Sequence, residues 1–283
     1  MVDKQDTLAI DRSNKTTKMK NLHTLALLAA GLLLTVSSCT KDKEPTPTTP
    51  TTPTTTTPTA PTPPPMNVDN TWGGLVAIKM TLSYSQMGMS IDVPSEMAVA
   101  SFFGGAYPNN TTQVSGGTVK LNDNQLDFTN NAYTKVAATG LTTSTLGIDG
   151  GVVWNVSGNG NIPAFTYTHT GAFPEFDGQV PTTINRADGF ALTLNSTTVS
   201  NADSVYVFIV SGNGNVLKRY GANAGPVTID GSDLSALSAS SDTNPVYLEI
   251  IPWKYTVAEV GTSSPKLMAF VKESVIVKSI TLN

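Results

Sequence analysis

From residue 66 to the end of the chain, apolar and polar residues alternate over short runs that are rich in Val, Ile, Thr and Tyr. Clusters of Gly, Asn, Asp and Pro separate these runs. Alternation with a period of two places every second side chain on one face of a strand, and the separating clusters are typical of turns. The pattern predicts strands over residues 75–84, 96–103, 117–121, 133–138, 151–156, 164–169, 190–195, 204–211, 216–220, 226–229, 246–257 and 266–281, the last of them with a break.

Helical periodicity is not sustained anywhere in this part of the sequence. We expect a single helical turn at residues 232–237, where Ser232 or Asp233 can cap the turn while Leu234 and Leu237 face inward. The predicted fold class is therefore all-β. More than 200 residues are enough for one large core or two smaller ones.

One six-residue motif occurs twice, because residues 156–161 and 210–215 both read Val-Ser-Gly-Asn-Gly-Asn. Gly and Asn tolerate positive φ, so the motif between two strand-like runs predicts a hairpin turn. A phosphate-binding loop would open onto a helix, and an extended run follows both copies, which favours the turn. The repeat indicates two related halves. We expect two tandem β-sandwich domains, at residues 66–174 and 175–283.

The N-terminal part of the chain has a different pattern, with a nearly unbroken apolar run at residues 22–36 after a short basic start at Met19-Lys20. The run is shorter than the roughly 20 residues of a membrane span. Its layout is typical of a secretory signal. Residues 1–18 carry several acidic residues and make a poor signal start, so we expect Met19 to be the initiator and residues 1–38 to be removed.

The end of this run resembles the lipobox of bacterial lipoproteins, with Val36-Ser-Ser directly before Cys39. The resemblance implies cleavage before Cys39, a diacylglycerol group on its thiol and an acyl group on the new amino terminus. Cys39 is the only cysteine, so it has no disulfide partner and no companion ligand for zinc. Several acyl chains make a durable anchor, whereas one binds only marginally. The alternative is an ordinary cleaved signal with a leftover thiol.

A polar stretch at residues 39–65 follows the predicted lipidation site. Residues 41–44 read Lys-Asp-Lys-Glu and resemble a loose form of the surface-export signal of Bacteroidota lipoproteins; the alternative is that they only keep the chain soluble. Residues 45–65 are Thr and Pro except for Ala60. Such a segment stays disordered and spans on the order of 60 Å at about 3.1 Å per residue. We expect a protein anchored by lipid to the outer membrane and displayed at the cell surface, with the periplasmic face as the alternative.

Four stretches of the second half stand out: the predicted strand at 203–208, the turn at 233–237, the strand at 246–252 and the final strand at 275–282. With these stretches the second half resembles immunoglobulin-like or fibronectin-III-like modules of bacterial surface proteins. The resemblance implies a β-sandwich, although the cysteines of immunoglobulin domains are absent. Residues 66–173 match no family that we can name.

The sequence gives little support for a catalytic site. His169 is the only histidine after the predicted signal, no nucleophile-elbow motif is present, and ligands for a zinc site are lacking. Glu175 and Asp177 would lie on the same side of an extended segment, which leaves a carboxylate-dependent hydrolase as one alternative function. Residues 122–127 and 230–233 supply oxygen atoms, but neither matches a calcium-binding loop. A net charge of −4 without a basic patch disfavours nucleic acid.

Aromatic residues are the remaining candidates for a ligand-binding site. Trp72, Trp253 and Tyr255 could stack on sugar rings, and burial in the core is the alternative for each of them. Trp154 alternates with apolar neighbours in a strand and is expected in the core. We therefore expect a non-catalytic binding, adhesion or structural module, without cofactor or metal, whose partner is a protein or a glycan. The other alternative function is a carbohydrate-binding accessory lipoprotein of polysaccharide uptake.

Overall fold

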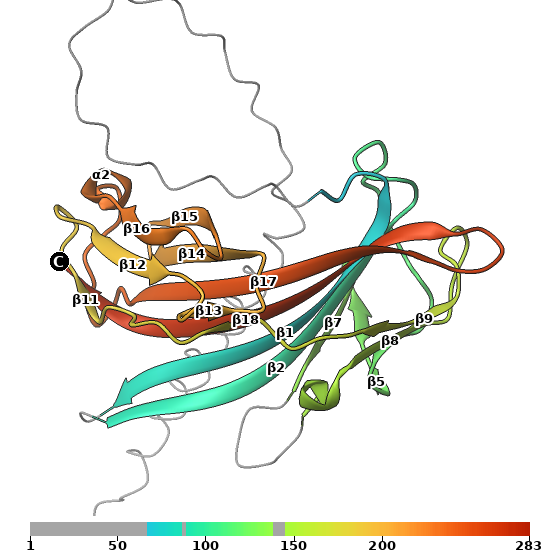
Figure 1. The fold of residues 1–283 in the computed structure, drawn as a ribbon, viewed down its shortest axis with the longest axis horizontal. Coiled ribbons are helices and arrows are strands. Elements are labelled where there is room, and N and C mark those ends of the chain that lie inside the picture. The colour runs from blue at the N-terminus through green and yellow to red at the C-terminus, as the bar shows by residue number, and fades with distance from the viewer. Residues whose placement is uncertain (1–66, 87–88, 138–144) are drawn as a thin grey trace, which may run out of the picture. The chain divides into compact units, whose positions relative to one another are not determined.

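The computed structural model describes residues 67–86, 89–137 and 145–283, and the predicted signal, Cys39 and the Thr/Pro tract lie outside them. The described part is built almost entirely from strands (Figure 1). This confirms the predicted all-β class. No helix among the described residues is long and apolar enough to cross a membrane.

A ten-stranded main sheet contains the longest strands, and its central path runs β15-β14-β17-β18-β1-β2-β7-β6, with β11 beside β18 and β3 beside β2. All neighbours are antiparallel except β1 with β18 and β11 with β18. The strands are β1 (Thr71–Gln86), β2 (Met89–Phe103), β3 (Gln113–Val114), β6 (Asp127–Thr129), β7 (Ala132–Val136), β11 (Thr183–Ile184), β14 (Ser204–Ser211), β15 (Gly214–Gly221), β17 (Val246–Val260) and β18 (Lys266–Leu282).

Three smaller sheets complete the described part. One has the order β5-β4-β8-β9, and the others are the pairs β12 with β16 and β10 with β13. A 3-10 turn η1 (Ile148–Gly150) and one short helix α2 (Gly231–Leu234) interrupt the strands. The remaining strands are β4 (Val119–Leu121), β5 (Asn124–Gln125), β8 (Val152–Val156), β9 (Phe165–His169), β10 (Glu175–Phe176), β12 (Phe190–Leu194), β13 (Val199–Ser200) and β16 (Gly225–Ile229).

Two hydrophobic cores lie on the same face of the main sheet. The first joins β1, β2 and β18 to the four-stranded sheet and contains Trp154, as expected. The second joins β14, β17 and β18 to the β12–β16 pair. Phe270 belongs to the first core and Ile280 to the second, and both are even-numbered positions of the uninterrupted strand β18. Since side chains alternate between faces, the two cores share one face of the main sheet.

The predicted arrangement of two tandem sandwiches is not shown. Strand β1, from the first expected half, pairs along its length with β18, from the second, and all the described residues belong to one compact unit. The break expected in the last strand is absent, because β17 and β1 pair with β18 on both of its sides. The two copies of the repeated motif do form hairpin turns, but one lies in the four-stranded sheet and the other at the edge of the main sheet.

Candidate functional site

The opposite face of the main sheet carries large apolar side chains that belong to neither core. Pairing places even-numbered residues of β1 and β14, and odd-numbered residues of β2, β17 and β18, on this side. The side chains are nevertheless buried. We call them the apolar face: Ile78, Met80, Leu82, Met97, Tyr206, Phe208, Ile251, Trp253, Val275 and Val277.

Two carboxyl groups lie among these apolar side chains. Glu273 is 0% exposed and Glu249 is 1% exposed. Neither oxygen of the Glu273 carboxyl group has a hydrogen-bond partner among the described residues, and the same holds for Oε2 of Glu249. Burial raises the pKa of each from 4.5 to about 8. Both groups are therefore mainly protonated at pH 7, so the apolar face carries little charge.

Aromatic rings gather at one end of the apolar face. Tyr206 stacks on Trp253 with ring centroids 5.6 Å apart, and Tyr255 lies 5.6 Å from the same indole. The backbone N–H of Asn67 donates to Oη of Tyr255 at 3.2 Å. The first described residue of the chain therefore lies beside the apolar face.

The structure brings together two of the three aromatic residues predicted to bind a ligand. Trp253 and Tyr255 are neighbours, whereas Trp72 packs against the first core and has Nζ of Lys266 over its ring at 3.8 Å. Stacking on a sugar needs an exposed ring face, and Trp253 is 1% exposed. The three residues thus form no open stacking surface in this structure, and their role as ligand-binding residues stays a prediction.

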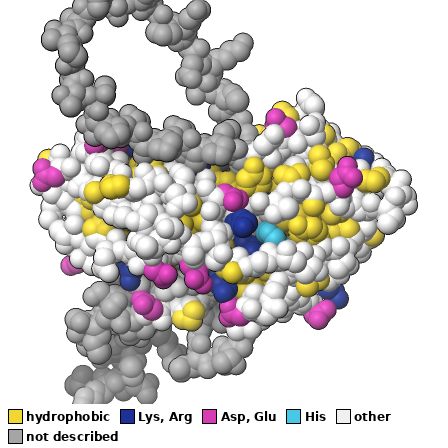
Figure 2. All heavy atoms as spheres, viewed as in Figure 1, with side chains coloured by type: hydrophobic (Ala, Val, Ile, Leu, Met, Phe, Trp, Pro, Cys, Tyr) yellow, Lys and Arg dark blue, Asp and Glu magenta, His cyan; other side chains and the backbone are white. Residues whose placement is uncertain are grey.

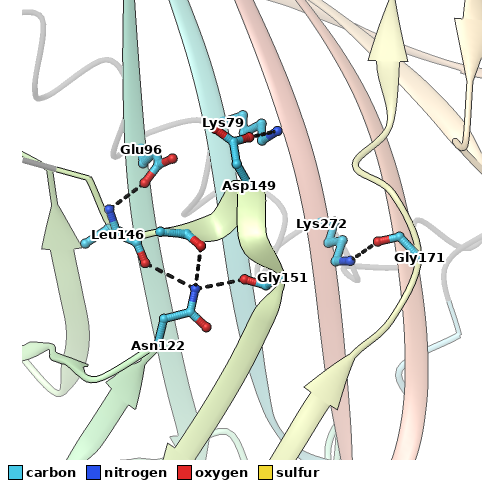
Figure 3. A network of polar contacts seen from close by, with 9 residues as sticks. Lys79, Glu96, Asn122, Leu146, Asp149, Gly151, Gly171 and Lys272 are labelled. Atoms are coloured by element: carbon cyan, nitrogen blue, oxygen red, sulfur yellow. Dashed lines mark hydrogen bonds and ion pairs between the residues drawn. The ribbon is translucent and has the colours of Figure 1, made fainter. Parts of the chain in front are cut away.

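The predicted carboxylate and oxygen-rich candidates occupy surface and turn positions. Glu175 and Asp177 are exposed, with the buried Phe176 between them. Asn122 joins a turn to the four-stranded sheet, because its Nδ2 donates to the carbonyl oxygens of Leu146, Gly147 and Gly151 (Figure 3). Its Oδ1 accepts from N–H of Val153. Turn chemistry accounts for Asn122, and the described residues contain no group of three or more His, Cys, Asp or Glu side chains that could hold a metal ion.

A second polar cluster lies between the two cores, on the face of the main sheet that carries them. Lys79 of β1, Lys272 of β18 and Lys254 of β17 occupy this position, which we call the lysine seam. The end of β9 supplies His169, and the connection from β9 to β10 supplies Phe173. Lys79 forms an ion pair with Asp149, and Nζ of Lys272 donates to the carbonyl oxygen of Gly171 at 2.6 Å (Figure 3). Nζ of Lys272 also donates to the carbonyl oxygen of Thr170 at 3.2 Å.

Sequence reasoning missed Glu249, Glu273 and Lys272. A weak signal was present, since each is a charged residue inside an apolar run that predicts a strand. Such residues are mostly exposed, so the pattern alone favoured a solvated position. Comparisons of the chain with protein-family models, with curated proteins and with solved structures find no match.

Proposed function

We propose that this protein is a lipid-anchored, non-catalytic binding module of the outer membrane, displayed at the cell surface, and that its apolar face holds an apolar polypeptide segment of a partner. The observation that carries the proposal is the burial of the apolar face, although its side chains belong to neither core of the described residues. Apolar side chains of this extent that are not part of a protein's own core mark an interaction site in soluble proteins.

The chemistry of the occupant follows from the chemistry of the face. Full burial of each large apolar side chain is worth about 1.5 to 3 kcal/mol, so the surface favours an apolar occupant. Protonated Glu249 and Glu273 can each donate one hydrogen bond, and backbone carbonyl groups of a polypeptide are suitable acceptors. A glycan, which is rich in hydroxyl groups, matches such a surface less well.

The chain itself contains a segment of the matching chemistry and length. The apolar run at residues 22–36 precedes Asn67, which lies beside the apolar face. Fifteen residues span about 22 Å as a helix. The face extends from β14 to β2 across four strand spacings, about 19 Å in total. Cleavage before Cys39 would remove this run, and a partner would supply a segment of similar chemistry.

The fold that accompanies this function is two sandwich-like cores on one shared sheet. A single sheet holds the apolar face as a continuous surface, because β17 and β18 each contribute residues to both cores and β1 pairs with β18. A rigid surface loses little conformational entropy on binding, which favours affinity. The Thr/Pro spacer would hold this surface away from the membrane.

The test uses a synthetic peptide with the sequence of residues 22–36 and the protein starting at Thr40, with fluorescence anisotropy as the measurement. We expect saturable binding. A peptide with Leu28→Asp and Leu32→Asp should bind at least tenfold more weakly, since each change puts a charge on an apolar surface. No saturable binding by the folded protein would contradict the proposal.

Variants of neighbouring positions on β1 locate the binding surface. Met80 lies on the apolar face and Thr81 points to the opposite side of the same strand. Met80→Lys should weaken peptide binding about tenfold, whereas Thr81→Lys should leave it unchanged. Equal losses of peptide binding in the two variants would show that the peptide binds elsewhere on the protein. Binding to phosphatidylethanolamine vesicles in preference to the peptide, or self-association without it, would replace the polypeptide partner by a lipid surface or a second copy.

A further inference from the structure

The lysine seam brings three ammonium groups together, and two of them form no ion pair with a described carboxylate. Lys254 and Lys272 are directly paired neighbours on β17 and β18, and Lys79 lies on the next strand. The ion pairs among the described residues include Lys79 with Asp149, but none includes Lys254 or Lys272. Two adjacent ammonium groups are therefore without an ion pair among the described residues.

Lys272 is a buried cation whose partners are neutral. It is 1% exposed, and its two hydrogen bonds go to backbone carbonyl groups. Phe173 lies between two lysines, with Nζ of Lys79 4.8 Å and Nζ of Lys272 5.3 Å from its ring centroid. Carbonyl groups and an aromatic ring reduce the cost of burying the ammonium group but do not cancel its charge. A lysine has three donors, so one N–H of Lys272 is left for another acceptor.

His169 adds an unused polar atom beside these lysines. It ends β9, is 5% exposed, and its Nδ1 has no hydrogen-bond partner in the structure. Burial and the nearby charges of Lys272 and Lys254 lower its pKa from 6.5 to about 4. The imidazole is neutral at pH 7 and can still donate from one ring nitrogen. A buried ring nitrogen without a partner is uncommon and points to a ligand.

The seam is accessible from solvent at Lys254, which is exposed. Figure 2 shows the single described histidine at the surface, next to lysine or arginine side chains and between two regions where hydrophobic side chains are visible. Lys79, Lys254 and Lys272 lie on the face of the main sheet that carries the two cores. The lysine seam is therefore on the opposite side of the main sheet from the apolar face.

We propose that the lysine seam binds a compact oxyanion with two negative charges, with Lys254, Lys272 and His169 as its donors. Two ammonium groups without a described ion pair match a dianion such as sulfate or hydrogen phosphate. The remaining N–H of Lys272, the exposed Nζ of Lys254 and the ring nitrogen of His169 supply three hydrogen bonds. Binding here is independent of the apolar face and needs no partner protein.

The experiment follows the imidazole proton signals of His169 by NMR in the full chain carrying His23→Gln, which removes the other histidine. Sodium sulfate and sodium phosphate are titrated at constant ionic strength set with sodium chloride, and sodium acetate is the singly charged comparison. We expect saturable shifts with the dianions, weaker binding of acetate, and a rise in the pKa of His169 on saturation. Shifts that are linear and equal to those with chloride would overturn the proposal.

Three methionine variants test the donors. Lys254→Met keeps an exposed position and should weaken dianion binding about tenfold, the value of one charge-assisted hydrogen bond. Lys272→Met should abolish saturation, and a folded amide spectrum is its control. Lys266→Met, on the same strand as Lys272 but over Trp72, should bind as the parent chain does. Unchanged binding by Lys254→Met would remove the seam as the site.

Discussion

Trp253 of β17 and Glu273 of β18 are directly paired across the main sheet and point to the same side, where the indole and the carboxyl group are both buried. Tyr206 stacks on this indole from β14. Burial raises the pKa of Glu273 to about 8, and it raises the pKa of Glu249 on the same face to about 8 as well. Burial of a carboxyl group without a partner costs stability once the group ionises.

The first prediction concerns stability at alkaline pH. Both glutamates have a folded-state pKa above the ordinary 4.5, so the folded chain binds more protons than the unfolded chain between pH 4.5 and about 8. The free energy of unfolding must therefore fall as pH rises through this window. At about 1.4 kcal/mol per pKa unit, each group accounts for a loss of about 2 to 5 kcal/mol by pH 8.

Urea unfolding between pH 5 and 8 measures this loss. Glu273→Gln should flatten the dependence and stabilise the protein at pH 8, because glutamine cannot ionise. Glu259→Gln is the matched control, since Glu259 lies on the same strand as Glu249 but is exposed. Equal slopes for Glu273→Gln and the parent chain would show that Glu273 does not titrate in this window.

The second prediction compares two lengths of the chain. If residues 22–36 can bind to the apolar face, Trp253 should be protected from acrylamide quenching in a full chain that carries Cys39→Ser. Trp253 should not be protected in the protein that starts at Thr40. Acrylamide quenching in a Trp72→Phe background reports this difference, because Trp154 is buried in the first core in both cases. In the shorter protein, the contribution of Glu273 to the pH dependence of the free energy of unfolding should also be smaller. Equal quenching in the two lengths would rule out this match.

The third prediction concerns His169, whose titration should lower the free energy of unfolding as pH decreases rather than as it rises. Its pKa is lowered from 6.5 to about 4, so the unfolded chain takes up a proton in this window that the folded chain does not. The free energy of unfolding should fall by up to about 3 kcal/mol as pH decreases from 6.5 to 4. His169→Gln should remove this contribution, as measured by urea unfolding in chloride buffers. Thr168→Gln, at the exposed neighbouring position, should keep it.

The fourth prediction concerns Tyr133, a buried residue of the first core. Its Oη bonds with Oγ of Ser115 at 2.8 Å, accepts from N–H of Gly116 at 3.0 Å and donates to the carbonyl oxygen of Gly117 at 2.7 Å. Tyr133→Phe keeps the ring but leaves these groups without that partner, so we expect a loss of about 1 to 3 kcal/mol in urea unfolding. Tyr107→Phe is the comparison. A loss below about 0.5 kcal/mol would mean that water replaces the hydroxyl group.

The fifth prediction concerns Asn122, whose amide donates to three carbonyl groups. Asn122→Asp replaces these donors by a carboxylate facing carbonyl oxygens, and thermal unfolding should show a loss of about 2 to 4 kcal/mol. Asn124→Asp makes the same chemical change two residues along and should cost less, since Asn124 Nδ2 makes two longer bonds, of 3.3 and 3.4 Å. Rescue of the Asn122 variant by calcium would instead support a metal site in this turn.

The sequence alone predicted most of the secondary structure. The pattern over residues 204–211 predicts the strand β14 with the bounds that the structure has, and the repeated Gly-Asn-Gly motif marks hairpin turns in both places. The core position of Trp154 followed from its alternation with Val152 and Val156. These features depend on neighbours within a few residues, so a local pattern suffices.

The tertiary structure decided which strands pair and which faces meet. The parallel pairing of β1 with β18 joins residues about 195 positions apart, and no local pattern encodes such a contact. In the middle of β1 the residues Leu75, Val76, Ala77 and Ile78 are all buried, so alternation could not reveal that one face belongs to a core and the other to the apolar face.

The limit of local sequence patterns also explains which parts of the candidate sites could be predicted. From the sequence, the Cys39 lipobox and the Thr/Pro tract predict where the protein resides, because targeting signals are short and linear. The tertiary structure alone brings Lys254 beside Lys272 and places Glu273 between Trp253 and Ile78, because cross-strand neighbours are set by pairing register. The burial of a charged side chain is a property of that assembled surface.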